Sequence, residues 1–292
     1  MKKFQALILL FVVLIAGALF FWNDILNFYS SLSLVLPKVE EGVGEFITKQ
    51  IEKQILTPPP LRSGKENPEA FLTKEGVINW TNAQRQKNGL PPLKENTKLN
   101  ASAKLKVEDM FAKQYFAHNS SSGQGVADLA EKVGYDFVVI GENLALGNYK
   151  DDQDLVQAWM DSPGHRENIL YDKYQEIGVW VQKGVFEGET TWLAVQHFGL
   201  PLSACPTPNN ALKIAIEENK NQLAEFKTEL ESLKAEIEPI RPKQDPDYYQ
   251  KVGKYNEEVS QYNELLRKTE SLMSSYNLQV QSFNQCVSQN QQ

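Results

Sequence analysis

Two blocks near the end of the chain place apolar side chains at alternating intervals of three and four residues. This spacing lines up one apolar stripe along each of two long helices, and each stripe must be buried against a partner. The first block lies within residues 209–240 and the second within 247–288. The stripes consist of Leu223, Phe226, Leu230, Leu233, Ile237 and Ile240, and of Val252, Tyr255, Val259, Tyr262, Leu266, Thr269, Met273, Tyr276, Val280, Phe283 and Val287.

The segment between the two blocks is rich in proline, which breaks helices. Asp245 can cap the second helix, with Pro246 at its first position. We therefore expect residues 201–292 to form an antiparallel helical coiled-coil hairpin that could bind a protein partner. Two separate helices that join an oligomeric coiled coil would have the same pattern, so this alternative stays open.

The chain has two cysteines, Cys205 before the first helix and Cys286 near the end of the second. A hairpin would bring these two positions together, and an exported protein could oxidise them. Closing so long a loop would stabilise the fold by roughly 4 kcal/mol in the chain-entropy model. Unpaired thiols and a bond between chains are the alternatives. The absence of a Cys-x-x-Cys pair excludes zinc-finger and thioredoxin-type motifs.

The amino terminus has the pattern of a targeting segment. Lys2 and Lys3 precede an apolar run, Phe4–Trp22, that only Gln5 interrupts. At about 1.5 Å per residue the run spans roughly 28 Å, close to the hydrocarbon thickness of a bilayer. We expect residues 1–22 to be a transmembrane anchor, with the remainder outside. Ala16-Gly17-Ala18 also fits a signal peptidase site, so a cleaved signal peptide is an alternative, and a buried soluble helix is a third.

The composition limits the classes of partner. The formal net charge is -7 and no long basic run occurs, so we expect no nucleic-acid binding. Residues 23–70 are expected to be a juxtamembrane stalk and a proline-rich linker, in which Thr57–Pro60 ends any helix. The expected location is the cell membrane, single-pass, with the carboxyl-terminal part extracellular; secretion is the alternative.

Residues 71–200 alternate between helical and strand patterns and are expected to form one α+β domain. Helices flanking a small, mostly antiparallel sheet would give a three-layer α/β/α sandwich. Trp159 and Trp192 are expected in its core. The expected helices are 73–88, 99–115, 126–133, 152–162 and 165–170, and the expected strands are 137–140, 177–182 and 190–198.

Three segments of this domain carry polar residues in distinctive contexts. They are Tyr115-Phe116-Ala117-His118, Gly141-Glu142-Asn143 and Trp159-Met160-Asp161-Ser162-Pro163-Gly164-His165-Arg166-Glu167-Asn168-Ile169-Leu170. In this order and spacing they resemble the bacterial branch of the CAP superfamily, which includes cysteine-rich secretory proteins, antigen 5 and pathogenesis-related proteins. Ile177-Gly178-Val179 and Val195-Gln196-His197-Phe198-Gly199 extend the resemblance.

The resemblance implies an α/β/α sandwich with a central cleft that holds two histidines and two acidic residues. His118, Glu142 and His165 match three of these four positions, and the fourth falls on Ser162. Two imidazoles and one carboxylate are a familiar set for zinc, with one position left for water. Glu142 could instead only fix the tautomer of a histidine. A metal site and a purely structural polar cluster are therefore both considered.

The other polar residues near these segments are expected to have structural roles. Strand alternation puts His197 on one face with Leu193 and Val195, and favours a position outside the cleft. Asn143 and Asn168 are expected to hold loops in place rather than bind a ligand.

Two functions from different classes fit the sequence. The first is an extracellular binding or interaction module with a lipid or cell-envelope ligand, and the resemblance implies no common catalytic activity. The second is a metal-dependent hydrolase of envelope peptides or peptidoglycan. The absence of an HExxH helix and of a nucleophile triad favours the binding module. A third hypothesis makes the hairpin the functional part.

Overall fold

The computed structural model describes residues 53–64, 67–240 and 245–291. The chain divides into two compact units. A helical unit consists of the described parts of Asn209–Leu278. An α+β unit consists of the described parts of Thr48–Pro208 and Gln279–Gln292.

The α+β unit is built on one sheet of six strands, ordered β1-β4-β6-β5-β3, with β2 also pairing with β4. The three long strands β4, β6 and β5 are antiparallel neighbours, as predicted. The three short strands pair in parallel, so the sheet is mixed. The strands are β1 (Gln54–Leu56), β2 (Leu61–Arg62), β3 (Lys94–Glu95), β4 (Phe137–Leu146), β5 (Glu176–Phe186) and β6 (Glu189–Pro201).

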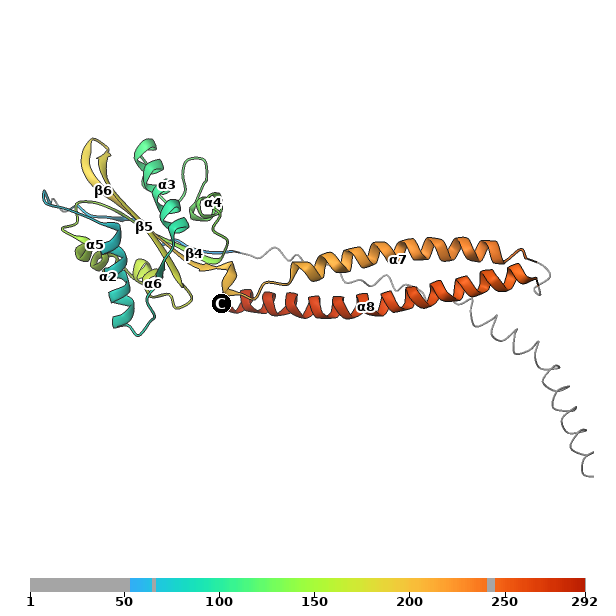
Figure 1. Cartoon of the computed structure of the whole chain (residues 1–292). Helices are drawn as coiled ribbons and strands as arrows, with labels where there is room; N and C mark the ends of the chain where they lie inside the picture. The colour runs from blue at the N-terminus through green and yellow to red at the C-terminus, as the bar shows by residue number, and fades with distance from the viewer. Residues whose placement is uncertain (1–52, 65–66, 241–244, 292) are drawn as a thin grey trace, which may run out of the picture. The chain divides into compact units, whose positions relative to one another are not determined.

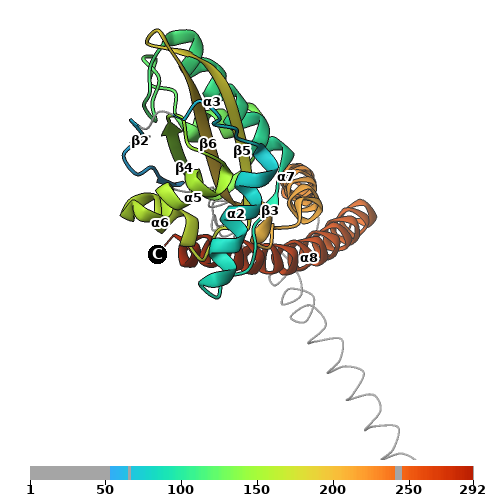
Figure 2. The ribbon, with the colours of Figure 1, turned by 90° about the vertical axis from the view of Figure 1, so that its left-hand side faces the viewer.

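Helices lie on both faces of this sheet (Figures 1 and 2). Along β6, Trp192, Ala194 and Phe198 pack into one apolar cluster, which also contains residues of α2, α5 and α6. Leu193 and Val195 point the other way and pack against α3. Alternation along a strand therefore produces two cores, one on each face. The helices are α2 (Lys74–Lys87), α3 (Thr97–Lys113), α4 (Val126–Lys132), α5 (Asp152–Asp161) and α6 (Pro163–Leu170).

Side-chain caps fix where these helices begin. Asn96 accepts hydrogen bonds from the Lys98 and Leu99 amides at the start of α3, and Asp151 accepts one from Asp154 at the start of α5. Asp151 is therefore the N-cap of α5. Asp152 instead accepts two hydrogen bonds from Thr73, the cap of α2. This contact joins the beginnings of α2 and α5.

Gly178 on β5 allows α3 to lie directly on the sheet. A Cβ atom at this position would come 2.1 Å from the backbone carbon of Leu99 and 2.3 Å from the amide nitrogen of Asn100. No side chain larger than hydrogen fits there without moving the helix. This close approach places Ser102 and Lys106 of α3 over β4 and β6, where the candidate site lies.

In the helical unit, α7 (Asn210–Ile237) and α8 (Pro246–Asn290) pack side by side in opposite directions (Figure 1). Their buried cluster consists of stripe residues of both helices, among them Leu230, Leu233, Ile237, Tyr255 and Tyr262. The Asp245 carboxylate accepts a hydrogen bond from the Asp247 amide at 2.8 Å, as predicted for the helix cap. The predicted packing of the two helices is confirmed.

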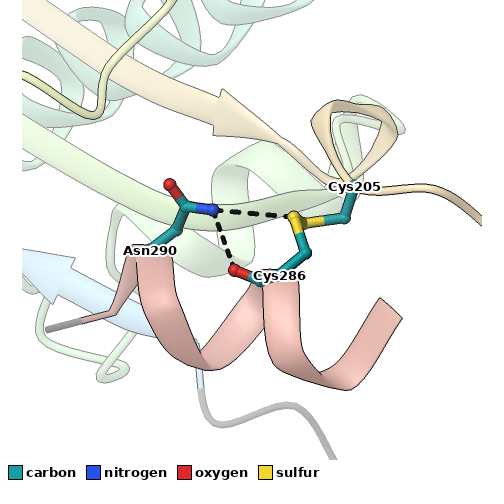
Figure 3. The surroundings of a disulfide bond; sticks show 3 residues. All are labelled: Cys205, Cys286 and Asn290. Atoms are coloured by element: carbon teal, nitrogen blue, oxygen red, sulfur yellow. Dashed lines mark hydrogen bonds between the residues drawn. A yellow bond between two sulfur atoms is a disulfide. The ribbon is translucent and has the colours of Figure 1, made fainter. Parts of the chain in front are cut away.

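Cys205 and Cys286 form a disulfide within the α+β unit, with their Cα atoms 5.7 Å apart (Figure 3). Asn290, one turn after Cys286, donates a hydrogen bond to the Cys286 carbonyl. Val287 is buried in the same apolar cluster as Cys205. The last turns of α8 are therefore part of the core of this unit.

The proposed membrane anchor at 1–22 and most of the stalk lie outside the described residues. Within residues 53–64, 67–240 and 245–291, no helix has the length and apolar character needed to cross a bilayer. Part of the expected linker has regular structure, because β1 and β2 continue the sheet along the outer edge of β4. The strand expected at 137–140 also continues through Leu146, so the Gly141-Glu142-Asn143 segment lies inside a strand rather than after it.

Candidate functional site

Glu142 is the centre of the candidate site and is completely buried in the middle of β4. Its Oε1 lies 2.6 Å from Nδ1 of His118, and its Oε2 lies 2.9 Å from Nε2 of His197. Each carboxylate oxygen therefore has an imidazole partner. Burial alone would raise the pKa of Glu142, but the hydrogen bonds from His118 and His197 outweigh burial and lower the pKa to about 2. The carboxylate is ionised and accepts from both rings.

His197 approaches Glu142 from the neighbouring strand. The two residues are direct partners in the register of β4 and β6, so their side chains leave the sheet on the same face. The other ring nitrogen of His197 lies 2.9 Å from the Ser102 hydroxyl of α3. Because Nε2 donates to the carboxylate, Nδ1 of a neutral ring can accept a hydrogen bond from the Ser102 hydroxyl. The face of β6 that carries His197 was predicted correctly, but the expectation that His197 lies apart from Glu142 was wrong.

His118 comes from the loop between α3 and α4 and closes the other side of Glu142. Its Nε2 contacts the carbonyl oxygen of Pro58, in the segment that joins β1 to β2. A carbonyl can only accept, and an ionised carboxylate can only accept. Both ring nitrogens of His118 must therefore donate, which makes the ring an imidazolium in this arrangement.

Lys106 of α3 adds a second positive charge next to this pair. Its side chain is almost fully buried, and its Nζ donates to the His118 carbonyl at 2.5 Å. Burial lowers the pKa of Lys106, while the nearby charge of Glu142 opposes this shift. The ammonium holds the loop that carries His118.

His165, at the start of α6, does not bond to Glu142. Its Nδ1 lies 2.8 Å from the Ser162 hydroxyl, and its Nε2 is buried with no hydrogen-bond partner of good geometry. Burial, and then the positive charge of His118, lower the pKa of His165 to about 4, against a weaker opposite effect from the Leu144 backbone. This ring is neutral at physiological pH.

Asn143 and Asn168 connect α6 to the strands, as their expected structural roles require. Asn143 points to the opposite face of β4 from Glu142 and donates to the His165 carbonyl at 3.2 Å. Asn168 donates to the carbonyls of Leu56 and Glu142. Both amides are buried. They fix the position of α6 relative to β1 and β4.

The residues that match the family's metal positions are not arranged as a metal site here. Within the described part of the chain, no three His, Cys, Asp or Glu side chains are grouped so that they could hold an ion. Zinc needs free nitrogen and oxygen lone pairs. Both Glu142 oxygens and both His118 nitrogens are already hydrogen bonded. The zinc set of His118, Glu142 and His165 does not fit unless these bonds break.

Sequence reasoning missed the roles of four residues in this site: Ser102, Lys106, His197 and Pro58. The register of β4 and β6 would have identified His197, since two central antiparallel strands place facing residues side by side. Ser102 follows from the face of α3 that lies on the sheet. Nothing in the sequence indicated that Pro58, in an expected linker, reaches His118.

The family model "CAP: Cysteine-rich secretory protein family" matches residues 78–198. The chain carries a CAP domain. The matched range includes the whole of the Glu142 cluster except Pro58.

Two Bacillus subtilis (strain 168) proteins resemble the CAP domain. "Uncharacterized protein YkwD" is 40% identical over 116 residues, which cover 40% of this chain and 43% of that protein. "Uncharacterized membrane protein YlbC" is 30% identical over 130 residues, which cover 44% of this chain and 37% of that protein. The chain therefore covers less than half the length of each of these relatives.

Among solved structures, an extracellular protein containing a SCP domain from Bacillus anthracis str. Ames is similar. It is 27% identical, with a TM-score of 0.38, over 43% of this chain and 39% of that chain. An outer surface protein from Borrelia burgdorferi is 22% identical, with a TM-score of 0.39, over 45% of this chain and 97% of that chain.

Proposed function

We propose that this is an exported, membrane-tethered protein whose CAP domain is a binding module for cell-envelope material and not an enzyme. The proposal rests on one observation: the Glu142 carboxylate is fully engaged in hydrogen bonds inside the fold. Both of its oxygens accept hydrogen bonds from imidazoles, and the side chain has no exposed surface. A general base or metal ligand needs a lone pair that can reach substrate or water.

Two further features support export. The Cys205–Cys286 disulfide is typical of an oxidising compartment outside the cytoplasm. The apolar segment at 4–22 could anchor the chain, and one relative is named as a membrane protein. In this proposal the CAP domain lies outside the membrane, and the helical unit offers a second surface for a protein partner.

Binding and hydrolysis can be separated with one set of preparations. The full chain is incubated with purified peptidoglycan and, separately, with lipid vesicles. Both are prepared from one batch of bacterial cells. Sedimentation measures binding, and released soluble fragments measure turnover. We expect sedimentation without release. Fragment release would establish the hydrolase instead, provided that Glu142→Gln abolishes it and the exposed-site control Glu189→Gln preserves it.

Metal content tests the zinc hypothesis in the same samples. We expect well below one equivalent of zinc per chain in the wild type by elemental mass spectrometry. A full equivalent that falls in both His118→Ala and His165→Ala would require the metal site. Protease added to intact cells tests the location, because an outward-facing CAP domain is cleaved without cell lysis.

A further inference from the structure

The segment Thr57–Pro60, named here the proline strap, crosses the candidate site from β1 to β2. Leu56 pairs with Gly141 of β4, and Leu61 pairs with Ala145. The four strap residues therefore pass the stretch of β4 that contains Glu142. Three of them are prolines, which have no N–H group to donate to a sheet. At these prolines the backbone can leave the hydrogen-bond pattern of the sheet without leaving an N–H donor unpaired.

Three contacts hold the strap in place, and two of them are hydrogen bonds to backbone carbonyls. The Pro58 carbonyl accepts from Nε2 of His118. Just before the strap, the Leu56 carbonyl accepts from the Asn168 amide at 3.1 Å. The third contact is steric, because a Cβ atom on Gly164 would come 2.7 Å from Cβ of Pro58. The absence of a side chain at Gly164 leaves room for the Pro58 ring.

These contacts indicate which ligand chemistry would fit the site. A buried carboxylate orients His118, and this ring presents one N–H to a backbone carbonyl. Asn168 presents an amide to a carbonyl two residues earlier. The outer edge of β4 pairs with an extended chain on both sides of the site. This combination suits a peptide backbone in extended form, with proline at the centre.

We propose that the outer edge of β4 beside Glu142 and His118 is a binding site for an extended, proline-containing peptide, and that the proline strap is its intramolecular occupant. An external peptide binds when it displaces the strap. The tethered strap has a high effective concentration at the site, so it competes strongly with any free peptide. This inference rests on the proposed binding function and specifies its ligand class as polypeptide.

A loosened strap should expose the site. The triple substitution P58G/P59G/P60G increases the conformational freedom that the strap loses when it docks. The matched control is P206G/P208G, which alters prolines in the loop before α7. The probe, called the proline peptide, is a fluorescent peptide with the sequence of residues 54–62. A second peptide, called the alanine peptide, carries alanine in place of the three prolines.

Fluorescence anisotropy with the full chain measures binding. We expect the triple variant to bind the proline peptide about tenfold or more tighter than the wild type and the P206G/P208G control. Adding His118→Ala to the triple variant should weaken binding about tenfold. The alanine peptide should bind more weakly than the proline peptide. Equal binding by the triple variant and the wild type, or binding that ignores His118→Ala, overturns the proposal.

Hydrogen exchange of residues 139–146 gives an independent readout. Exchange should be slow in the wild type, faster in the triple variant, and slow again with bound peptide. Unchanged exchange in a folded triple variant also overturns the proposal. If the triple variant does not fold, Pro59→Gly replaces it, because the Pro59 ring is exposed. Peptide binding without peptidoglycan or vesicle binding would contradict the envelope function and leave this inference standing.

Discussion

Glu142 and His197 face each other across β4 and β6, and their side chains are joined by a 2.9 Å hydrogen bond in a fully buried position. The pair places a negative charge inside the domain and compensates it there. His118 supplies the second hydrogen bond from a loop and also contacts Pro58. The site is therefore a connected set of donors and acceptors that reaches from α3 to the proline strap.

Removal of the Glu142 charge should destabilise the CAP domain. In Glu142→Gln, the new amide NH₂ would oppose one of the two imidazole N–H groups, and one buried donor would lose its partner. We expect the free energy of unfolding to fall by about 2 kcal/mol. Urea unfolding followed by tryptophan fluorescence measures the change. Glu189→Gln, at an exposed position of β6, should leave stability within about 0.5 kcal/mol.

Acid should destabilise the domain through His165. The pKa of this ring is lowered from 6.5 to about 4 in the fold, so between these values the unfolded chain binds more protons than the native one. Stability is fully present above pH 6.5 and is lost as pH falls towards 4, by roughly 2–3 kcal/mol. His165→Gln should flatten this part of the unfolding profile. An equally steep profile in both proteins would show that His165 is not the group responsible.

Two glycines should respond to alanine in opposite directions. Gly178→Ala forces a methyl group into the backbone of α3 and should cost at least about 3 kcal/mol. Gly253, inside α8, has no atom within 4 Å of an added Cβ. Alanine there should stabilise the helical unit by about 0.5–1 kcal/mol, because glycine is a poor helix former. Melting temperatures of the two full-length variants test both signs.

Loss of the disulfide should loosen the end of α8. In Cys205→Ala/Cys286→Ala, we expect the α+β unit to lose roughly 4 kcal/mol, since the bond closes a sequence separation of 81 residues. Amide exchange in residues 283–290 should become faster. Dithiothreitol should reproduce this effect in the wild type and leave the double variant unchanged. Slow exchange at 283–290 in the double variant would show that apolar packing alone holds these turns.

The sequence predicted the elements of this protein better than the contacts of its site. The apolar stripe of α3 and the strand patterns of β5 and β6 follow from local periodicity, which is why their positions were predicted closely. β4 was predicted too short, because Glu142 and Asn143 are polar and resemble loop residues. Both are satisfied by partners distant in the chain, and local patterns do not contain that information.

The contact of Pro58 was even harder to predict from local sequence patterns. Three consecutive prolines indicate a linker by any local rule. They lie beside the sheet here because β1 and β2 pair on either side of them and His118 binds the carbonyl between. Such a contact depends on the tertiary structure, which local sequence rules do not describe. His118, the partner of Glu142, bonds to the Pro58 carbonyl, and Gly164, the neighbour of His165 in α6, lies beside the Pro58 ring.

The nitrogen NMR spectrum of the three histidine side chains tests the account most directly. In the full chain, we predict that both ring nitrogens of His118 carry a proton and donate hydrogen bonds. We predict that Nε2 of His197 carries the proton that is shared with Glu142, and that His165 is neutral at pH 6. Glu142→Gln should remove the distinctive signals of His118 and His197 together. A His118 with an unprotonated nitrogen and a His197 protonated on Nδ1 would contradict the assignment of Glu142 as acceptor to both rings.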